Sequence, residues 1–261
     1  MRRNVWAIVM CKKIAEFTRR EITGYRNYHQ ISDLGVVQFK NNYDAELLRV
    51  ILDKARKIKD SYAEMRQLNL NYIRDASAHI PEICELLHSP ERIEVAEQLT
   101  GVRLEPYPIS VISSIITFAG ACPKDGAITW HSDGVPLTEL VPLEIVDPDG
   151  GELELYRGCA DEGLARVHAG ETISPEETIR ITHRMGYSVL GQLMRLMHRV
   201  RPMFAGHRIT LNLNYRSADQ PYIDDNSMCY LAADNPDFRW LNQYLEDVRS
   251  RQLPAYLRSL G

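Results

Sequence analysis

The hydrophobic period of the chain changes near residue 103, and this change limits the folds that the chain can adopt. Before it, apolar residues recur at helical spacing, whereas after it they alternate or gather in short runs rich in β-branched residues. The clearest run is HRITLNLNY at residues 207–215, a strand pattern with one apolar and one polar face. Helices followed by many short strands favour an α+β domain built on an antiparallel sandwich or barrel.

The first part of the chain predicts three helices. One follows Asp44 and runs through residues 46–60, and another lies near residues 80–87. A third opens at Ser89, which is followed by proline, and stops at Gly101.

The second part predicts a series of short strands. They lie at residues 109–119, 127–133, 139–146 and 151–157, with a Gly-rich turn at 147–151 before the last of them.

We expect a single domain over residues 1–261, with a mainly helical support (1–103), a core of strands (104–218) and a helical tail (219–261). The core is predicted to contain an insertion at about 159–203, with a helix through SVLGQLMRLMHRV.

Charge and cysteine content exclude several classes of protein. The net charge of -4 gives no basic field for nucleic acid or an anionic membrane. No apolar segment approaches the roughly 20 residues that span a bilayer, and we interpret Val5 to Cys11 as the first piece of the fold. The five cysteines are scattered and form no CxxC motif, which favours reduced thiols in a cytoplasmic protein. The oligomeric state cannot be inferred.

The segment Trp130-His131-Ser132-Asp133-Gly134 suggests a metal site. Residues two apart on a strand point to the same face, so His131 and Asp133 can offer a nitrogen and an oxygen to one ion. We predict His207, at the start of the amphipathic strand, as the third ligand. Two histidines and one carboxylate leave three positions open, as in non-haem iron oxygenases. An isolated His-x-Asp is also common in turns, so the inference depends on the whole set.

Three other histidines compete with His207 for the third position. His168 and His183 lie in the predicted insertion and could approach the site as part of a lid. His198 falls on the predicted helix and is interpreted as a surface or packing residue.

Arg216 is the predicted anchor for an anionic co-substrate, because a guanidinium can meet a carboxylate with two parallel hydrogen bonds. It follows His207 by nine residues, so a regular strand would place the two on opposite faces unless a bulge intervenes. Arg208 is the alternative anchor, although the same parity points it outward. A solvated surface arginine is the competing interpretation for either.

These segments resemble the core of the Fe(II)/2-oxoglutarate-dependent dioxygenase superfamily. The likeness rests on WHSDGVP, on ELVPLEIVDPDGGELELYRG and on GHRITLNLNYRS. The front half, with SDLGVVQFKN and LLHSPERIEVAEQLTG, is similar to the phytanoyl-CoA-dioxygenase-like branch. In that family an arginine follows the distal histidine by about ten residues. Some relatives follow this arginine with x-Ser, whereas here Ser217 is directly adjacent to Arg216.

The resemblance implies a double-stranded β-helix (a jelly-roll or cupin-like core) with N-terminal and C-terminal helices packed outside. It also implies Fe(II) bound by His131, Asp133 and His207, with Arg216 holding 2-oxoglutarate, and O₂ as the third reactant. Oxidative decarboxylation would then drive hydroxylation of an unactivated C–H bond of a small molecule, such as an amino acid or a specialised metabolite. An aspartate at position 133 favours hydroxylation or desaturation over halogenation. Trp130 and Arg157 are candidates for substrate contact.

Two other functions stay open at this point. One is a cupin-type metalloenzyme that does not use 2-oxoglutarate, which would need a fourth protein ligand or lack the arginine. The other is a non-catalytic binding protein with a degenerate site.

Overall fold

A computed structural model describes residues 11–25, 29–65, 71–121 and 128–261. Most of the interpreted segment Val5 to Cys11, and also Cys122, lie outside the described residues. Within the described part, no helix is both long and apolar enough to cross a membrane.

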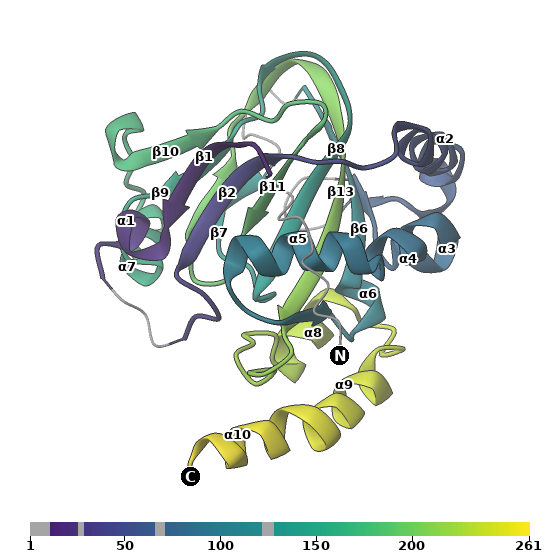
Figure 1. Cartoon of the computed structure of the whole chain (residues 1–261). Coiled ribbons are helices and arrows are strands. Elements are labelled where there is room, and N and C mark those ends of the chain that lie inside the picture. Colours follow the sequence, from purple (N-terminus) through teal and green to yellow (C-terminus); the bar gives the residue numbers. More distant parts are fainter. Residues whose placement is uncertain (1–10, 26–28, 66–70, 122–127) are drawn as a thin grey trace.

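The described strands form two antiparallel sheets (Figure 1). The larger has nine strands, in the order β1 (Lys13–Thr18), β2 (Leu34–Lys40), β11 (Tyr187–Gly191), β8 (Leu137–Gly150), β13 (Met203–Ser217), β6 (Ser114–Gly120), β4 (Asn71–Ile73) and β3 (Glu64–Met65), with β5 (Leu104–Pro106) also paired to β13. The smaller has four, in the order β10 (Thr178–Ile181), β9 (Leu153–Tyr156), β12 (His198–Val200) and β7 (Ile128–His131). This is the predicted α+β class with a jelly-roll core.

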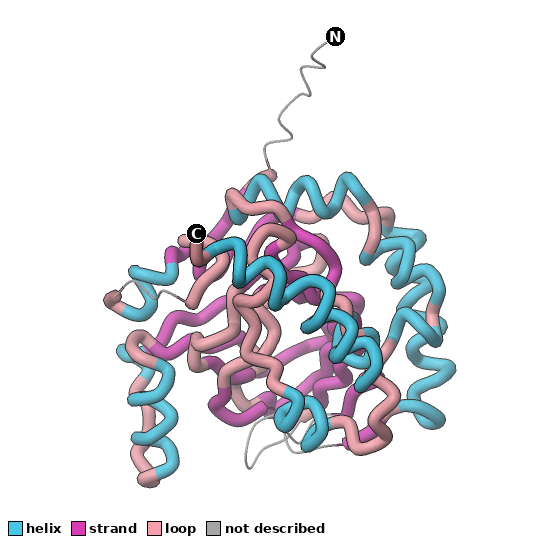
Figure 2. Tube along the Cα trace, turned by 90° about the horizontal axis from the view of Figure 1, so that it is seen from below, coloured by secondary structure: helices cyan, strands magenta, loops and turns pink. Residues whose placement is uncertain are grey.

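The described helices lie outside the sheets (Figures 1 and 2). They are α1 (Arg19–Thr23), α2 (Ala45–Tyr62), α3 (Ala76–His79), α4 (Pro81–Leu87), α5 (Pro90–Thr100), α6 (Ser110–Ser113), α7 (Ala160–His168), α8 (Met228–Asp234), α9 (Leu241–Asp247) and α10 (Leu253–Ser259), with a 3-10 turn at Pro175–Glu177 and a π-helical turn at Val248–Gln252. Figure 2 shows α9 and α10 crossing one end of the strands.

The three helices predicted in the first part are confirmed, with their caps. The Asp44 carboxylate accepts a hydrogen bond from the backbone of Glu46 at the start of α2. Ser89 caps α5, and Gly101 ends it with a φ of 73°. The apolar faces of α2, α4 and α5 pack on the outer face of the larger sheet, so that Ile51 and Ile83 belong to the main core.

The helix predicted at SVLGQLMRLMHRV is wrong, because this segment forms β11, a loop and β12. β11 is buried on both faces: Val189 packs into one core cluster and Leu190 into another. A strand buried on both faces has a continuous apolar run that periodicity cannot distinguish from a helix. The predicted insertion at 159–203 therefore contributes strands to both sheets.

Two strand predictions need smaller corrections. The segment 109–119 begins with the short helix α6, and its strand starts only at Ser114. The turn predicted at 147–151 comes later than expected, because residues 147–150 extend β8, the end of which pairs with the start of β13. Only residues 151–152 link β8 to β9, and they carry the chain from one sheet to the other.

Candidate metal centre

His131 and Asp133 are held in place at the end of β7. His131 is the last residue of that strand. Asp133 stays extended because its backbone N–H donates to the carbonyl of Leu193 at 3.1 Å, within an isolated bridge to Met194. The two side chains therefore share a face, as their spacing predicts.

His198 completes the group. It opens β12 and lies directly opposite His131 in the β12–β7 pair, with the two ring centroids 4.2 Å apart. The Nε2 atoms of His131 and His198 lie 3.4 Å and 3.6 Å from Oδ1 of Asp133. Within the described residues these three form a candidate metal-binding group whose ligand atoms all lie within 4.8 Å of one another. Two imidazoles and one carboxylate are the donor set that non-haem iron oxygenases use.

The hydrogen bonds of both rings leave Nε2 free for a metal ion. Nδ1 of His131 lies 2.8 Å from the carbonyl oxygen of Thr129, and Nδ1 of His198 lies 2.8 Å from that of Leu196. A carbonyl only accepts, so each neutral ring carries its proton on Nδ1 and a lone pair on Nε2. Backbone carbonyls in this role orient metal-ligating histidines.

The three ionisable groups are strongly coupled. Burial and, to a lesser extent, the neighbouring His131 lower the pKa of His198 to about 4. Burial acts in the same direction on His131, but Asp133 more than offsets it, so the pKa of His131 is raised. Burial would raise the pKa of Asp133, but both histidines outweigh it and the pKa is lowered. The site thus keeps a carboxylate and one uncharged imidazole at neutral pH.

The structure places His207 away from this group. It lies on β13, its side chain is 47% exposed, and its Nε2 is 2.7 Å from a carboxylate oxygen of Glu144. Its neighbour Arg208 points into the cavity between the sheets, and successive strand residues face opposite ways. The structure therefore does not bring His207 to this group, and His198 lies in the place that was predicted for it.

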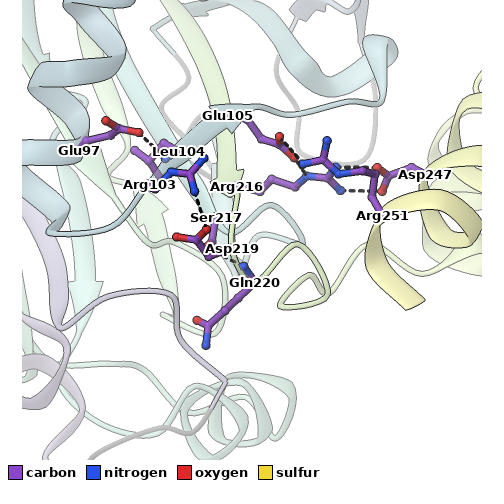
Figure 3. Close-up of polar contacts among 10 residues, drawn as sticks. All are labelled: Glu97, Arg103, Leu104, Glu105, Arg216, Ser217, Asp219, Gln220, Asp247 and Arg251. Atoms are coloured by element: carbon purple, nitrogen blue, oxygen red, sulfur yellow. Dashed lines mark hydrogen bonds and ion pairs between the residues drawn. The ribbon is translucent and has the colours of Figure 1, made fainter. Parts of the chain in front are cut away.

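Arg216 is also engaged elsewhere, as Figure 3 shows. Its Nη1 and Nη2 donate to the two carboxylate oxygens of Asp247 at 2.6 Å and 2.5 Å, and its Nε donates to Glu105 at 2.9 Å. Burial would lower its pKa, but these carboxylates raise it overall. The guanidinium is already neutralised within the protein, beneath α9. Arg216, the predicted anchor, therefore does not line the cavity that His131 and Asp133 line.

Arg208 has the opposite environment. It is 7% exposed, its Nε donates to Thr210 at 3.1 Å, and its Nη1 donates to the carbonyl of Gly151. No carboxylate lies within ion-pair distance of it among the residues that the structure describes, although the charge of Glu152, which pairs with Arg201, acts on it through space and favours its charged form. Burial lowers its pKa to about 10, which still leaves it charged at neutral pH. A buried cation that no carboxylate contacts directly is costly, so this position favours an anionic ligand.

One cavity of about 500 Å³ connects the metal group and Arg208. The polar face of β13, which its alternating sequence shows, lines this cavity instead of facing solvent. The members of that face are Arg208, Thr210, Asn212 and Asn214.

The other predicted site residues divide between the cavity and the surface. Trp130 lines the cavity, with the Arg199 guanidinium 4.6 Å from its ring centroid. Arg157 is exposed, and the structure does not bring it to the cavity. Among the competing histidines, His168 is exposed at the end of α7, whereas His183 is buried and lines the cavity.

No protein-family model matches the chain, and no curated protein matches its sequence significantly. Solved structures do share its fold. It is similar to the non-heme alpha ketoglutarate dependent carbocyclase SnoK from nogalamycin biosynthesis, at 17% identity over 71% of this chain and 80% of that chain, with a TM-score of 0.53. It is also similar to the non-heme alpha ketoglutarate dependent epimerase SnoN from nogalamycin biosynthesis, at 19% identity over 71% of this chain and 78% of that chain, with a TM-score of 0.51. A third similar structure is EctD from S. alaskensis with bound Fe, at 17% identity over 80% of this chain and 84% of that chain, with a TM-score of 0.53.

The fold is therefore that of the non-haem iron, 2-oxoglutarate-dependent oxygenases. The likeness to the phytanoyl-CoA-dioxygenase-like branch stays a prediction.

Proposed function

We propose that this chain is an Fe(II)/2-oxoglutarate-dependent oxygenase that hydroxylates a small molecule. In this proposal His131, Asp133 and His198 bind the iron, and Arg208 holds the distal carboxylate of 2-oxoglutarate. The observation that carries it is the combination in one cavity of a metal-sized His-Asp-His group and a buried arginine that no carboxylate contacts directly among the described residues.

The residues present fit the metal. Both imidazoles direct an Nε2 lone pair toward a carboxylate oxygen, and their Nδ1 atoms are held by backbone carbonyls. Three ligands leave open positions for co-substrate and oxygen. Bound iron would supply O₂ activation coupled to oxidative decarboxylation of 2-oxoglutarate.

The protein's own contribution is binding, orientation and exclusion of water. The two facing strands β7 and β12 place the ligands on rigid backbone. Arg208 supplies directional hydrogen bonds and a charge that match a carboxylate. Trp130, at the cavity wall, remains our candidate for contact with the substrate.

Both alternative functions lose support from these observations. A cupin-type enzyme without 2-oxoglutarate would need a fourth ligand or no arginine, whereas the described residues give three candidate ligands and a cavity-facing Arg208. The nine-residue spacing would put His207 and Arg216 on opposite faces of a strand, which supported a degenerate binding protein. That objection does not apply when Arg208 is the proposed anchor.

A pair of histidine variants tests the metal site. Loss of the ligand in His198→Ala should weaken Fe(II) binding by at least about 100-fold, because even second-shell changes cost 10- to 100-fold. His207→Ala should bind iron as the wild type does. Equilibrium dialysis under nitrogen measures both.

Turnover is then measured as succinate formed from 2-oxoglutarate under air. It should occur in the wild type and in His207→Ala, and it should vanish in Asp133→Ala. Iron binding that is lost in His207→Ala but kept in His198→Ala would contradict the proposed site.

A further inference from the structure

A second polar side chain, that of His183, lies at the Arg208 end of the cavity. It follows β10 by two residues, and the β10–β9 ladder sets Ile181 opposite Leu153. His183 and Gly151 each lie two residues beyond this pair, at the same end of the ladder, and the carbonyl of Gly151 accepts the hydrogen bond from Arg208. His183 and Arg208 both line the cavity, and the charge of Arg208 affects the imidazole.

The imidazole of His183 is buried without any hydrogen-bond partner among the described residues. The residue is 8% exposed, and both Nδ1 and Nε2 are buried and unsatisfied. Buried polar atoms in proteins are almost always paired, and each unpaired one costs about 1–3 kcal/mol. A histidine with two such atoms facing a cavity indicates a ligand that is not part of the chain.

The charge state of His183 limits what that ligand is. Burial and the neighbouring Arg208 hold its pKa well below the ordinary value, so the ring is neutral. A neutral imidazole has one N–H donor and one acceptor. It does not belong to the metal-binding group found among the described residues. At this place the imidazole N–H can donate a hydrogen bond to the anionic group that Arg208 attracts.

We propose that His183 is a co-substrate-binding residue that donates its N–H to the distal carboxylate of 2-oxoglutarate, beside the guanidinium of Arg208. This inference rests on the proposed function. Two nitrogens of Arg208 donate to Thr210 and Gly151, which leaves Nη2 for the ligand. The imidazole then holds the second carboxylate oxygen without adding another charge. The chain would thereby select a dicarboxylate over a 2-oxo acid of the same length that lacks the distal carboxylate.

The test compares two ligands on variants of the anaerobic Fe(II)-loaded protein by isothermal titration calorimetry. The ligands are 2-oxoglutarate and 2-oxopentanoate, which has the same chain length and no distal carboxylate. His183→Phe should weaken 2-oxoglutarate binding by roughly 10- to 100-fold, the effect of one hydrogen bond to a charged group. It should leave the Kd of 2-oxopentanoate unchanged. His168→Phe, at an exposed histidine, is the matched control and should change neither.

Two further variants identify the donating nitrogen. His183→Asn places an amide N–H near the position of Nδ1, and His183→Gln places one near that of Nε2. One of the two should retain 2-oxoglutarate affinity close to that of the wild type. If the Phe variant does not fold, this pair carries the same test.

The outcomes separate the two proposals. A wild-type protein that binds Fe(II) but neither ligand would refute the proposed function. If the wild type binds 2-oxoglutarate while the His183 variants bind it equally well, or lose both ligands in parallel, the role of His183 is refuted and that of Arg208 stands.

Discussion

Two buried arginines, Arg208 and Arg216, should respond in opposite ways to the same substitution. In Arg216→Met, Asp247 keeps only the amide of Gln252 as a side-chain donor, at 2.9 Å, and stays buried with its charge. Breaking a buried pair from one side costs about 3–5 kcal/mol. At roughly 2–4 °C per kcal/mol for a chain of this size, Tm should fall by about 6–20 °C. The 2-oxoglutarate affinity of the folded fraction should not change.

Arg208→Met should instead change Tm little and weaken the binding of 2-oxoglutarate. It removes hydrogen bonds to Thr210 and Gly151, at a cost of about 1 kcal/mol each, but it also removes a buried charge that no described carboxylate contacts directly. Tm should stay within a few degrees of the wild type. The lost charge-assisted hydrogen bond from Nη2, at about 1.5–3 kcal/mol, weakens 2-oxoglutarate binding by at least roughly 10- to 100-fold.

Differential scanning calorimetry and titration with 2-oxoglutarate on the same preparations measure both quantities. The reasoning fails if Arg216→Met keeps its Tm but loses 2-oxoglutarate, or if Arg208→Met binds 2-oxoglutarate normally.

Three further predictions concern pH and backbone strain. Burial raises the pKa of Asp224 to about 6, above its unfolded value, so its contribution to stability is present at low pH and is lost as pH rises through 6. Asp224→Asn should therefore gain more Tm relative to the wild type at about pH 7.5 than at about pH 4, and an equal change at both would contradict the assignment. Metal binding requires unprotonated ligands, so Fe(II) affinity measured by dialysis should drop from about pH 8 to about pH 6 as His131, whose pKa is raised, takes up a proton. A pH-independent affinity over that interval would argue against His131 as a ligand. Gly151→Ala should lower Tm, since φ there is 80° and a Cβ would approach Cε of Met203 to 2.5 Å; an unchanged Tm would show that this turn relaxes.

Much of the architecture was predictable because local signals and global fold agree. Caps at Asp44 and Ser89 mark helices that the structure confirms. The alternating run at 207–215 is the central strand β13. The jelly-roll itself came from the family resemblance, and the spacing of His131 and Asp133 put both on one face without knowledge of the fold.

The sequence does not indicate His198 as the third member of the candidate metal-binding group, because the hydrophobic period of its segment is ambiguous. The apolar run around His198 was interpreted as an amphipathic helix, which made that histidine a packing residue. In the structure it is a strand residue opposite His131. One signal in the sequence does favour it, because Arg208 follows His198 by ten residues, the approximate spacing that the resemblance predicts between the distal histidine and the arginine.

The co-substrate anchor could not be chosen from the sequence for a different reason. Arg208 and Arg216 lie on the same strand, and a strand pattern says only which residues share a face. What distinguishes them is charge neutralisation by residues distant in the chain: Glu105 and Asp247 surround Arg216, whereas no carboxylate contacts Arg208 directly among the described residues. An arginine that is already neutralised has little to offer a ligand, and a buried one that is not neutralised is stabilised by binding an anion. The polar face of β13 turns toward the cavity for a related reason, because the apolar residues of this strand are stabilised more by packing into the main core beneath the outer helices.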